Sequence, residues 1–150
     1  MVSMENIREF TSQKNIAVAG VSRNSKKFGN AIFKELKKKG IQVYPVHPNM
    51  DEFEGQKCFP DIGSLPVEVS GIVINTRPDV TKKLVDEAKQ KGIKNIWLQQ
   101  GSADKDYLNN LETDNYNIIS KQCILMFADP VNGVHGFHRW MRKNFGKFPH

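Results

Sequence analysis

The feature that most constrains the fold is a short apolar segment that ends in glycine and leads into a polar, basic loop. Residues 16–20 read Ile-Ala-Val-Ala-Gly, which is typical of a buried β-strand. The loop at 21–29 follows, and a segment with helical periodicity comes after it. Glycine lets a backbone approach a ligand closely, and a helix N-terminus offers N–H groups and a favourable dipole to an anion. This turn therefore predicts a site for a phosphate-bearing ligand, in particular a nucleotide.

Segments typical of strands and of helices alternate along the chain. Strands are expected at 16–20, 41–46, 71–75, 95–98 and 117–120, with a brief one near 57–59. Helices are expected at 3–12, at 29–39, from 78 to the glycine at 92, and from 103 to 111. The pattern predicts an α/β fold, namely one Rossmann-like, doubly wound parallel sheet of about five strands plus a short one, with helices on both faces. The helix that begins at Pro78 is expected to bury Val80, Leu84, Val85 and Ala88.

The length of 150 residues suits one domain with a single core, so residues 1–150 are expected to form one unit. That unit includes a helical extension at about 130–150, whose apolar face is expected to pack on the domain or, alternatively, on a second copy. No stretch approaches the ~20 apolar residues of a membrane span, and the first residues do not resemble a signal peptide. Cys58 and Cys123 form no CxxC pair, which favours a reducing compartment, and we expect a cytoplasmic protein.

The net charge of +6 is concentrated in one segment. Residues 23–39 hold seven lysines and arginines against Glu35, which accounts for the whole excess. A positive field over the first loop and helix would attract an anionic ligand. The side chains of Lys26 and Lys27 are candidates for contact with that ligand, whereas the lysines at 37–39 favour a helix C-terminus. Binding to nucleic acid is not expected.

The dinucleotide fingerprint of NAD-binding proteins is missing. Such a site would show GxGxxG and an acidic residue at the end of the second strand. Here Gly20 is followed by no glycine before Gly29, and the second strand ends at 46–48 with no carboxylate before Asp51. The pattern therefore favours a nucleotide other than NAD, although an enzyme that depends on NAD(P) or another nucleotide is kept as an alternative.

Ligands of open parallel sheets bind at the carboxyl ends of the strands, so the residues that directly follow each strand are the candidates for the site. These residues are Gly20, Val21, Ser22, Val46, His47, Pro48, Asn75, Thr76, Arg77, Pro78, Gln99, Gln100 and Gly101.

Several of these stretches, taken in order, resemble the small CoA-binding-domain family, whose members are similar to the CoA-binding domain of the succinyl-CoA synthetase α subunit. The matching stretches are Val18–Ser22 with Lys27–Gly29, Val43–Asn49, Asn75–Pro78, Ile96–Gly101 and Cys123. The resemblance covers residues 14–125, and it departs from the family at His47, where asparagine is more common. The chain also continues past Cys123, as in a longer subgroup with a Met-Phe-Ala-Asp-Pro segment and a basic terminal helix.

The resemblance implies coenzyme A, or an acyl-CoA, as the bound cofactor. The pyrophosphate would lie at the turn 20–22 and at the helix start formed by Phe28 and Gly29, and Ser22 would add a hydroxyl donor. The 3′-phosphate would pair with Arg23, Lys26 or Lys27. The adenosine would be bordered by residues 46–48.

The remaining matched residues are assigned to the long arm of CoA. Asn75–Pro78 would lie near the pyrophosphate and pantetheine, and Gln99 and Gly101 would edge the pantetheine. Cys123 would lie where the thiol arrives, so a mixed disulfide with oxidised CoA is one hypothesis and an inert, buried thiol is the other. Ordinary structural roles in turns and helix caps remain alternatives for the rest of the set.

Catalysis is not expected from this chain by itself. Related CoA ligases need a phosphorylatable histidine on a second domain and a nucleotide-grasping module, and 150 residues are too few for either. The sequence has no GxSxG, HExxH or Walker motif. His135, His138 and Asp129 do not define a metal site. We therefore predict a CoA-binding protein whose partners are CoA and either a second copy or an acyl-CoA enzyme. A protein-interaction module with a degenerate pocket is the second alternative.

Overall fold

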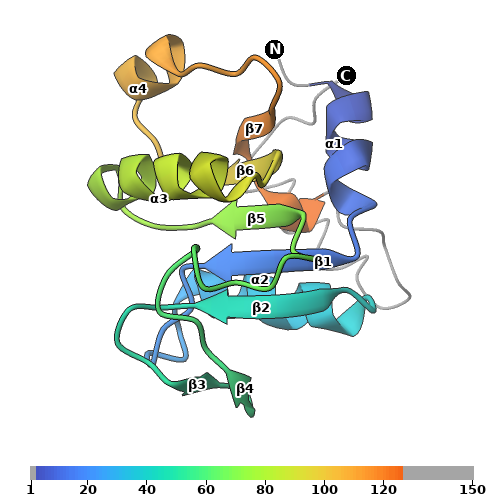
Figure 1. Ribbon diagram of the computed structural model, residues 1–150, viewed down its shortest axis with the longest axis vertical. Coiled ribbons are helices and arrows are strands. Elements are labelled where there is room, and N and C mark those ends of the chain that lie inside the picture. The colour runs from blue at the N-terminus through green and yellow to red at the C-terminus, as the bar shows by residue number, and fades with distance from the viewer. Residues whose placement is uncertain (1–2, 127–150) are drawn as a thin grey trace.

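A five-stranded parallel sheet in the order β2-β1-β5-β6-β7 forms the centre of the computed structural model, which describes residues 3–126 (Figure 1). Its strands are β1 (Asn15–Ala19), β2 (Gln42–Val46), β5 (Gly71–Ile74), β6 (Asn95–Gln99) and β7 (Asn117–Gln122). A separate antiparallel hairpin is formed by β3 (Glu52–Phe53) and β4 (Gln56–Lys57). The helices of the described residues are α1 (Met4–Thr11), α2 (Phe28–Lys38), α3 (Pro78–Lys91) and α4 (Lys105–Asn110), with a 3₁₀ turn η1 (Ile124–Met126). The predicted α/β class and Rossmann-like parallel sheet are confirmed, and the expected extension at 130–150 lies outside the described residues.

Alternate residues of each strand supply two apolar cores, one on each face of the sheet. Ile16 and Val18 of β1 belong to the core that includes α1 and α2, and Ala17 and Ala19 belong to the core under α3. On the first face, the rings of Phe10 and Trp97 meet edge to face at 5.3 Å between centroids. The alternation follows from the two-residue period of a strand, and it accounts for strands that are apolar throughout.

The strand order reverses beside β1. The chain passes from β1 outward to β2, and residues 47–70 then carry it back to β5 on the other side of β1. Within that segment, Phe59 pairs with Val46 in an isolated bridge, and the hairpin β3–β4 extends away from the sheet (Figure 1). The expected short strand near 57–59 is therefore divided between this bridge and β4.

Two helices differ in detail from the expectation. Helix α4 begins only at Lys105, after the cap residue Asp104, and it buries no residue completely. On α3 the residues buried against the sheet are Thr81, Val85 and Ala88, and Gly92 ends the helix with φ of 87°. Val80 and Leu84 are half-buried instead, because they lie on the flank of α3 that faces the cavity described below. Within residues 3–126, no helix is long and apolar enough to cross a membrane.

Candidate functional site

A cavity of about 810 Å³ opens at the carboxyl ends of β1, β2, β5 and β6, where the strand order reverses. This is the location at which open parallel sheets bind ligands. Most of the residues expected from the sequence line it, and they come from four separate segments. They are Gly20, Val21, Ser22, Lys27, Phe28, Val46, His47, Pro48, Asn75, Thr76, Arg77, Pro78 and Gly101.

Five expected residues, among them the exposed Lys26, do not line the cavity. Arg23 is exposed, and its Nη2 donates a hydrogen bond to the carbonyl oxygen of Asn49, so it joins the loop after β1 to the loop after β2. Gly29 is buried beneath the turn at Gly20. The other two, Gln99 and Cys123, lie together on the far side of β6.

Gln99 and Cys123 form a buried cluster with the 3₁₀ turn. The side chain of Gln99 is 4% exposed, and its Oε1 accepts a hydrogen bond from the backbone N–H of Ile124 at 3.1 Å. Cys123 is 3% exposed and belongs to the core on the α1–α2 face. Burial raises the pKa of the Cys123 thiol, and the hydrogen bond from Gln99 opposes that rise only in part. The cavity is lined next to β6 by the neighbouring residue Gln100 instead.

The cavity also includes residues that the strand-end rule does not find. They come from the flank of α3, from the loop that crosses back from β2, and from the turn after β6. They are Pro60, Asp61, Val80, Lys83, Leu84, Glu87 and Ser102. The spacing 80, 84, 87 follows one line along a helix, so periodicity could have identified this flank as a distinct stripe. Periodicity alone could not have told whether a sheet or a cavity lies against it.

Two glycines bring the start of α2 against the end of β1. A Cβ added to Gly29 would lie 2.1 Å from the carbonyl oxygen of Gly20, and a Cβ added to Gly20 would lie 2.5 Å from that of Asn75. The φ angle of Gly20 is 139°, which side-chain-bearing residues rarely adopt. Both glycines therefore permit backbone contacts that close the floor of the cavity.

The two helices that begin at the cavity have unusual N-caps. In α1 and α4, the side chains of Ser3 and Asp104 accept hydrogen bonds from the first turn. In α2 and α3, the N-cap residues are Lys27 and Arg77, and neither side chain caps its helix. Positive side chains are unfavourable at the positive end of a helix dipole unless an anion lies nearby. Both ends therefore place a cation at the cavity. The start of α2 also offers backbone N–H groups, an arrangement that binds phosphate. Helix α3 offers fewer, because it begins with Pro78, which has no N–H, and it carries Asp79 in its first turn.

The loop after β1 is held by the buried side chain of Asn30, which is 3% exposed. Its Oδ1 accepts from the backbone N–H of Ser22 at 2.8 Å, and its Nδ2 donates to the carbonyl oxygens of Ser22 and Asn24 at 2.9 and 3.1 Å. The Oγ of Ser22 accepts from the N–H of Asn24 at 3.1 Å. Sequence reasoning missed Asn30, because it lies inside the helix and not at the end of a strand.

The polar residues around the cavity differ in how firmly they are held. The Nδ1 of His47 accepts from the N–H of Asn49 at 3.0 Å, which places the proton of the neutral ring on Nε2. Burial, and to a lesser extent the charge of Arg23, lower the pKa of His47. The Oγ atoms of Thr76 and the fully buried Thr81 are 2.8 Å apart.

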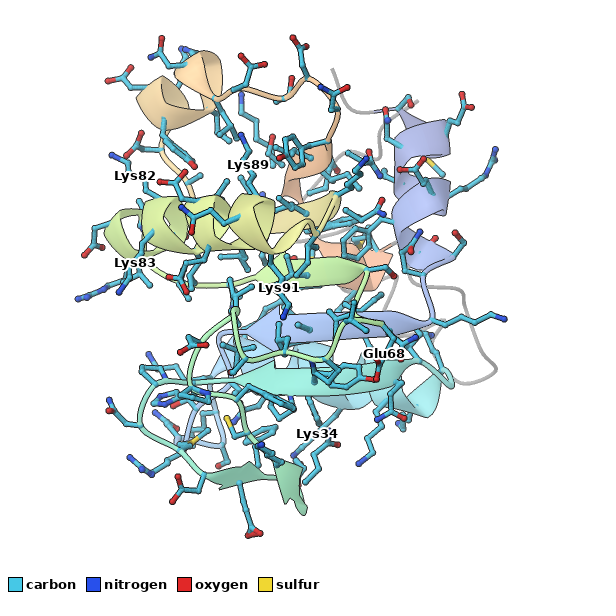
Figure 2. The ribbon with its side chains drawn as sticks, viewed as in Figure 1. Lys34, Glu68, Lys82, Lys83, Lys89 and Lys91 are labelled. Carbon is cyan, nitrogen blue, oxygen red and sulfur yellow. The ribbon has the colours of Figure 1, made fainter. Side chains whose placement is uncertain are left out.

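The charged side chains at the cavity are of both signs. Arg77 pairs with Asp79 at 3.7 Å, but both side chains are more than 70% exposed (79% and 74%), so the pair adds little stability and leaves Arg77 able to turn to a ligand. Lys83 and Glu87 lie farther along α3 and line both this cavity and an open hollow next to it. Lys91 (Figure 2) reaches from the end of α3 to the crossing loop, and its Nζ donates to the carbonyl oxygen of Gly63 at 2.8 Å. Among residues 3–126, no three His, Cys, Asp or Glu side chains are grouped so as to hold a metal ion.

The sequence of this chain is similar to a known domain family and to part of a larger named protein. A sequence profile described as "CoA binding domain" matches residues 14–129, which include all strands of the sheet and every residue that lines the cavity. The ADP-forming acetate–CoA ligase II of Archaeoglobus fulgidus is 29% identical over 136 residues, which cover 88% of this chain and 20% of that protein. The chain thus spans only a fifth of the length of that curated relative.

Solved structures of similar length are also close in fold. A conserved hypothetical protein from Pyrococcus furiosus is 38% identical with a TM-score of 0.69, and the match covers 74% of this chain and 96% of that one. A hypothetical protein from Pyrococcus horikoshii OT3 is 26% identical with a TM-score of 0.74, over 97% of this chain and 94% of that one. The similarity to these short proteins extends over nearly their whole length.

Proposed function

The chain belongs to the CoA binding domain family, and on that premise we propose that it binds coenzyme A or an acyl-CoA in the cavity at the carboxyl ends of β1, β2, β5 and β6. The ligand is held there without catalysis by this chain alone. The observation that carries the proposal is the pair of helix ends at Lys27 and Arg77, both without a capping side chain and both at the cavity.

These two helix ends fit the charge of CoA. The pyrophosphate carries negative charge at the middle of the molecule, and it would take the place of the missing caps at α2 and α3. The backbone contact between Gly20 and Gly29 keeps the start of α2 close to the strand ends, so phosphate oxygens could approach both helices. The hydroxyl group of Ser22 would add a donor from the loop.

The remaining parts of the ligand are assigned by what lines the cavity on either side of the helix ends. Val46, His47 and Pro48 would border the adenosine. The pantetheine amides need hydrogen-bond partners, and the side chain of Asn75, which lines the cavity together with Gly101, would provide one. Of the three cations expected to bind the 3′-phosphate, Lys27 alone lines the cavity, so we assign that role to Lys27.

We further propose that the protein acts in the cytoplasm beside an acyl-CoA enzyme. A relative that is named as a CoA ligase contains the equivalent of this chain as a fifth of its length, which supports a CoA-holding unit that serves a larger enzyme. Both cysteines are free and buried, which suits a reducing compartment. Co-purification of the tagged chain with and without CoA in the buffer tests the partnership. A partner without acyl-CoA chemistry would contradict it, and recovery of a homodimer would favour the second assembly expected from the sequence.

The binding proposal is tested by thermal melting with CoA, acetyl-CoA, dephospho-CoA, NAD and NADP. A ligand at one hundred times its dissociation constant adds about 2.7 kcal/mol to the free energy of unfolding, which is readily measured. We expect CoA to raise the melting temperature most and dephospho-CoA to raise it less. The Lys27→Gln variant should reduce the effect of CoA to that of dephospho-CoA. The variant Lys14→Gln should not, because Lys14 directly precedes β1 and lies at the opposite end of that strand from the cavity. A shift with NAD or NADP and none with CoA would refute the proposal.

A further inference from the structure

We propose that Asn30 is the positioning residue of the phosphate loop, because it turns the carbonyl groups of Ser22 and Asn24 away from the ligand. The proposal rests on the proposed function in one respect, which is that the loop faces a phosphate-bearing ligand. It goes further by assigning a role to a residue that does not line the cavity.

The first argument is that every polar group of Asn30 is used by this one loop. The side chain is 3% exposed, and it has one acceptor and two donor hydrogens available. The acceptor takes the N–H of Ser22, and the two donor hydrogens go to the carbonyl oxygens of Ser22 and Asn24. Three hydrogen bonds from one buried amide define the shape of the stretch Ser22–Asn24 within this loop, because all of the partners are backbone atoms.

The second argument concerns the charge that a phosphate would meet. A backbone carbonyl oxygen carries partial negative charge and repels a phosphate oxygen, so a loop that binds phosphate has to direct its carbonyl groups elsewhere. The Nδ2 group of Asn30 provides the alternative partner for two of them. The carbonyl oxygen of Asn24 also accepts from the N–H of Lys27, at 3.0 Å, which binds it further to the helix start.

The third argument is that the same hydrogen bonds decide what Ser22 can offer. Its N–H is already donated to Asn30, so the backbone of Ser22 is not a donor to the ligand. Its Oγ accepts from the N–H of Asn24, which leaves the hydroxyl hydrogen to be donated. Ser22 therefore contributes its hydroxyl group, and the N–H donors come from the start of α2.

The position of Asn30 depends on its neighbour. Gly29 has no side chain, and this lets α2 lie against the carbonyl group of Gly20. The third residue of the helix is thereby brought under the loop that follows Gly20. Aspartate at the same position would keep the acceptor for Ser22 but would lose both donors and add a negative charge below the loop.

The experiment compares Asn30→Ala, Asn30→Asp and a matched control, Asn117→Ala. Asn117 is also a buried asparagine (9% exposed), and its Nδ2 donates to the carbonyl oxygen of Asn6 and to Asn95 Oδ1 at 2.9 and 3.0 Å. It lies at the start of β7, at the opposite end of the sheet from the cavity. Titration calorimetry with CoA, ADP and inorganic pyrophosphate is performed at a temperature at which circular dichroism shows each variant to be folded.

We expect both Asn30 variants to weaken the binding of CoA and ADP by about tenfold or more, and Asn30→Asp to weaken it more than Asn30→Ala. The additional loss in Asn30→Asp should shrink as salt is added, because it is electrostatic. The control should be less stable but should bind with unchanged affinity. Amide hydrogen exchange gives an independent readout, since the N–H of Ser22 should stay protected in Asn30→Asp and lose protection in Asn30→Ala.

The outcomes separate this inference from the proposed function. If the wild type binds CoA and both Asn30 variants bind equally well, the inference is overturned and the function stands. If the wild type binds ADP or pyrophosphate but not CoA, and the variants lose that binding, the function fails and the inference stands. If no probe binds the wild type, or if Asn117→Ala weakens binding as much as the Asn30 variants do, the role assigned to Asn30 is wrong.

Discussion

A Cβ atom on Gly29 would lie 2.1 Å from the carbonyl oxygen of Gly20, so the start of α2 and the end of β1 are in direct backbone contact. No side chain fits in that space. The contact places the N-terminus of α2 at the carboxyl end of β1, where the cavity opens. It joins Gly20, which directly follows β1, to Gly29, the second residue of α2, nine positions along the chain.

Replacement of Gly29 by alanine should therefore lower the free energy of unfolding by about 3 kcal/mol, because the new methyl group would force the helix away from the strand. Urea denaturation of the two proteins measures the difference. The displaced helix end should also weaken CoA binding.

A suitable control for that substitution is Gly63→Ala. A Cβ at Gly63 would meet its nearest atom, Asp61 Oδ1, at 3.6 Å, which is an ordinary contact. We expect a change within about 0.5 kcal/mol. Equal losses in both variants would show that the close approach of Gly29 to Gly20 is unimportant.

Thr81 supports the cavity wall through its hydroxyl group. It is fully buried, and its Oγ1 lies 2.8 Å from that of Thr76, which lines the cavity. Thr81→Val should cost about 1 kcal/mol of unfolding free energy, because a buried hydrogen bond is lost without a change in side-chain volume. A double-mutant cycle with Thr76→Val, followed by chemical denaturation, should give a coupling of at least ~0.5 kcal/mol. Strictly additive losses would mean that the two hydroxyl groups do not interact.

His47 should make stability depend on pH in a defined direction. Burial, followed by the charge of Arg23, lowers the pKa of His47 below its ordinary value of 6.5. The unfolded chain then binds the proton more tightly than the folded one does. The contribution of neutral His47 to stability is therefore fully present above pH 6.5, and it is lost as the pH falls from that value through the lower pKa of the folded state. The free energy of unfolding should decrease between pH 7.5 and 5.5 by more in the wild type than in His47→Gln. A larger decrease in the variant would show that protonation of His47 stabilises the folded protein, which is the opposite of what we expect.

The thiol of Cys123 should react slowly while the protein is folded. It is 3% exposed, and burial raises its pKa above the usual value, so little thiolate is present near neutral pH. Intact-mass measurements should detect slow modification by iodoacetamide or CoA disulfide in buffer and fast modification in urea. Rapid formation of a CoA adduct on the folded protein, absent in Cys123→Ser, would instead favour the mixed disulfide considered from the sequence.

The regular elements were largely predictable because their signals are local. The apolar run at 16–20 and the glycines at 40 and 92 mark the ends of elements through strand periodicity and left-handed backbone conformation, which depend only on nearby residues. The strand-end rule likewise found most of the cavity lining, since parallel strands bring their carboxyl ends to one edge. The family resemblance noted from the same stretches is confirmed by the match over residues 14–129.

The exceptions all depend on contacts between distant segments. Val80 and Leu84 of α3 were predicted to be buried against the sheet, yet they face the cavity. The reason is that the sheet covers only the flank of α3 that holds Thr81 and Val85. Arg23 was assigned to the ligand, yet it binds the carbonyl group of Asn49 in another loop.

Amino-acid order thus specified the strands, the helices, the glycine turn and the basic character of the first loop, since each depends on neighbours in the chain. Three other features depend on how those elements are packed. They are the hydrogen bond between Asn30 and Ser22, the flank of α3 that faces the cavity, and the burial of Gln99 and Cys123. A helix has several faces, and periodicity identifies them without telling which one a distant strand or loop will cover. That choice is made by the strand order β2-β1-β5-β6-β7, which brings segments far apart in the chain into contact.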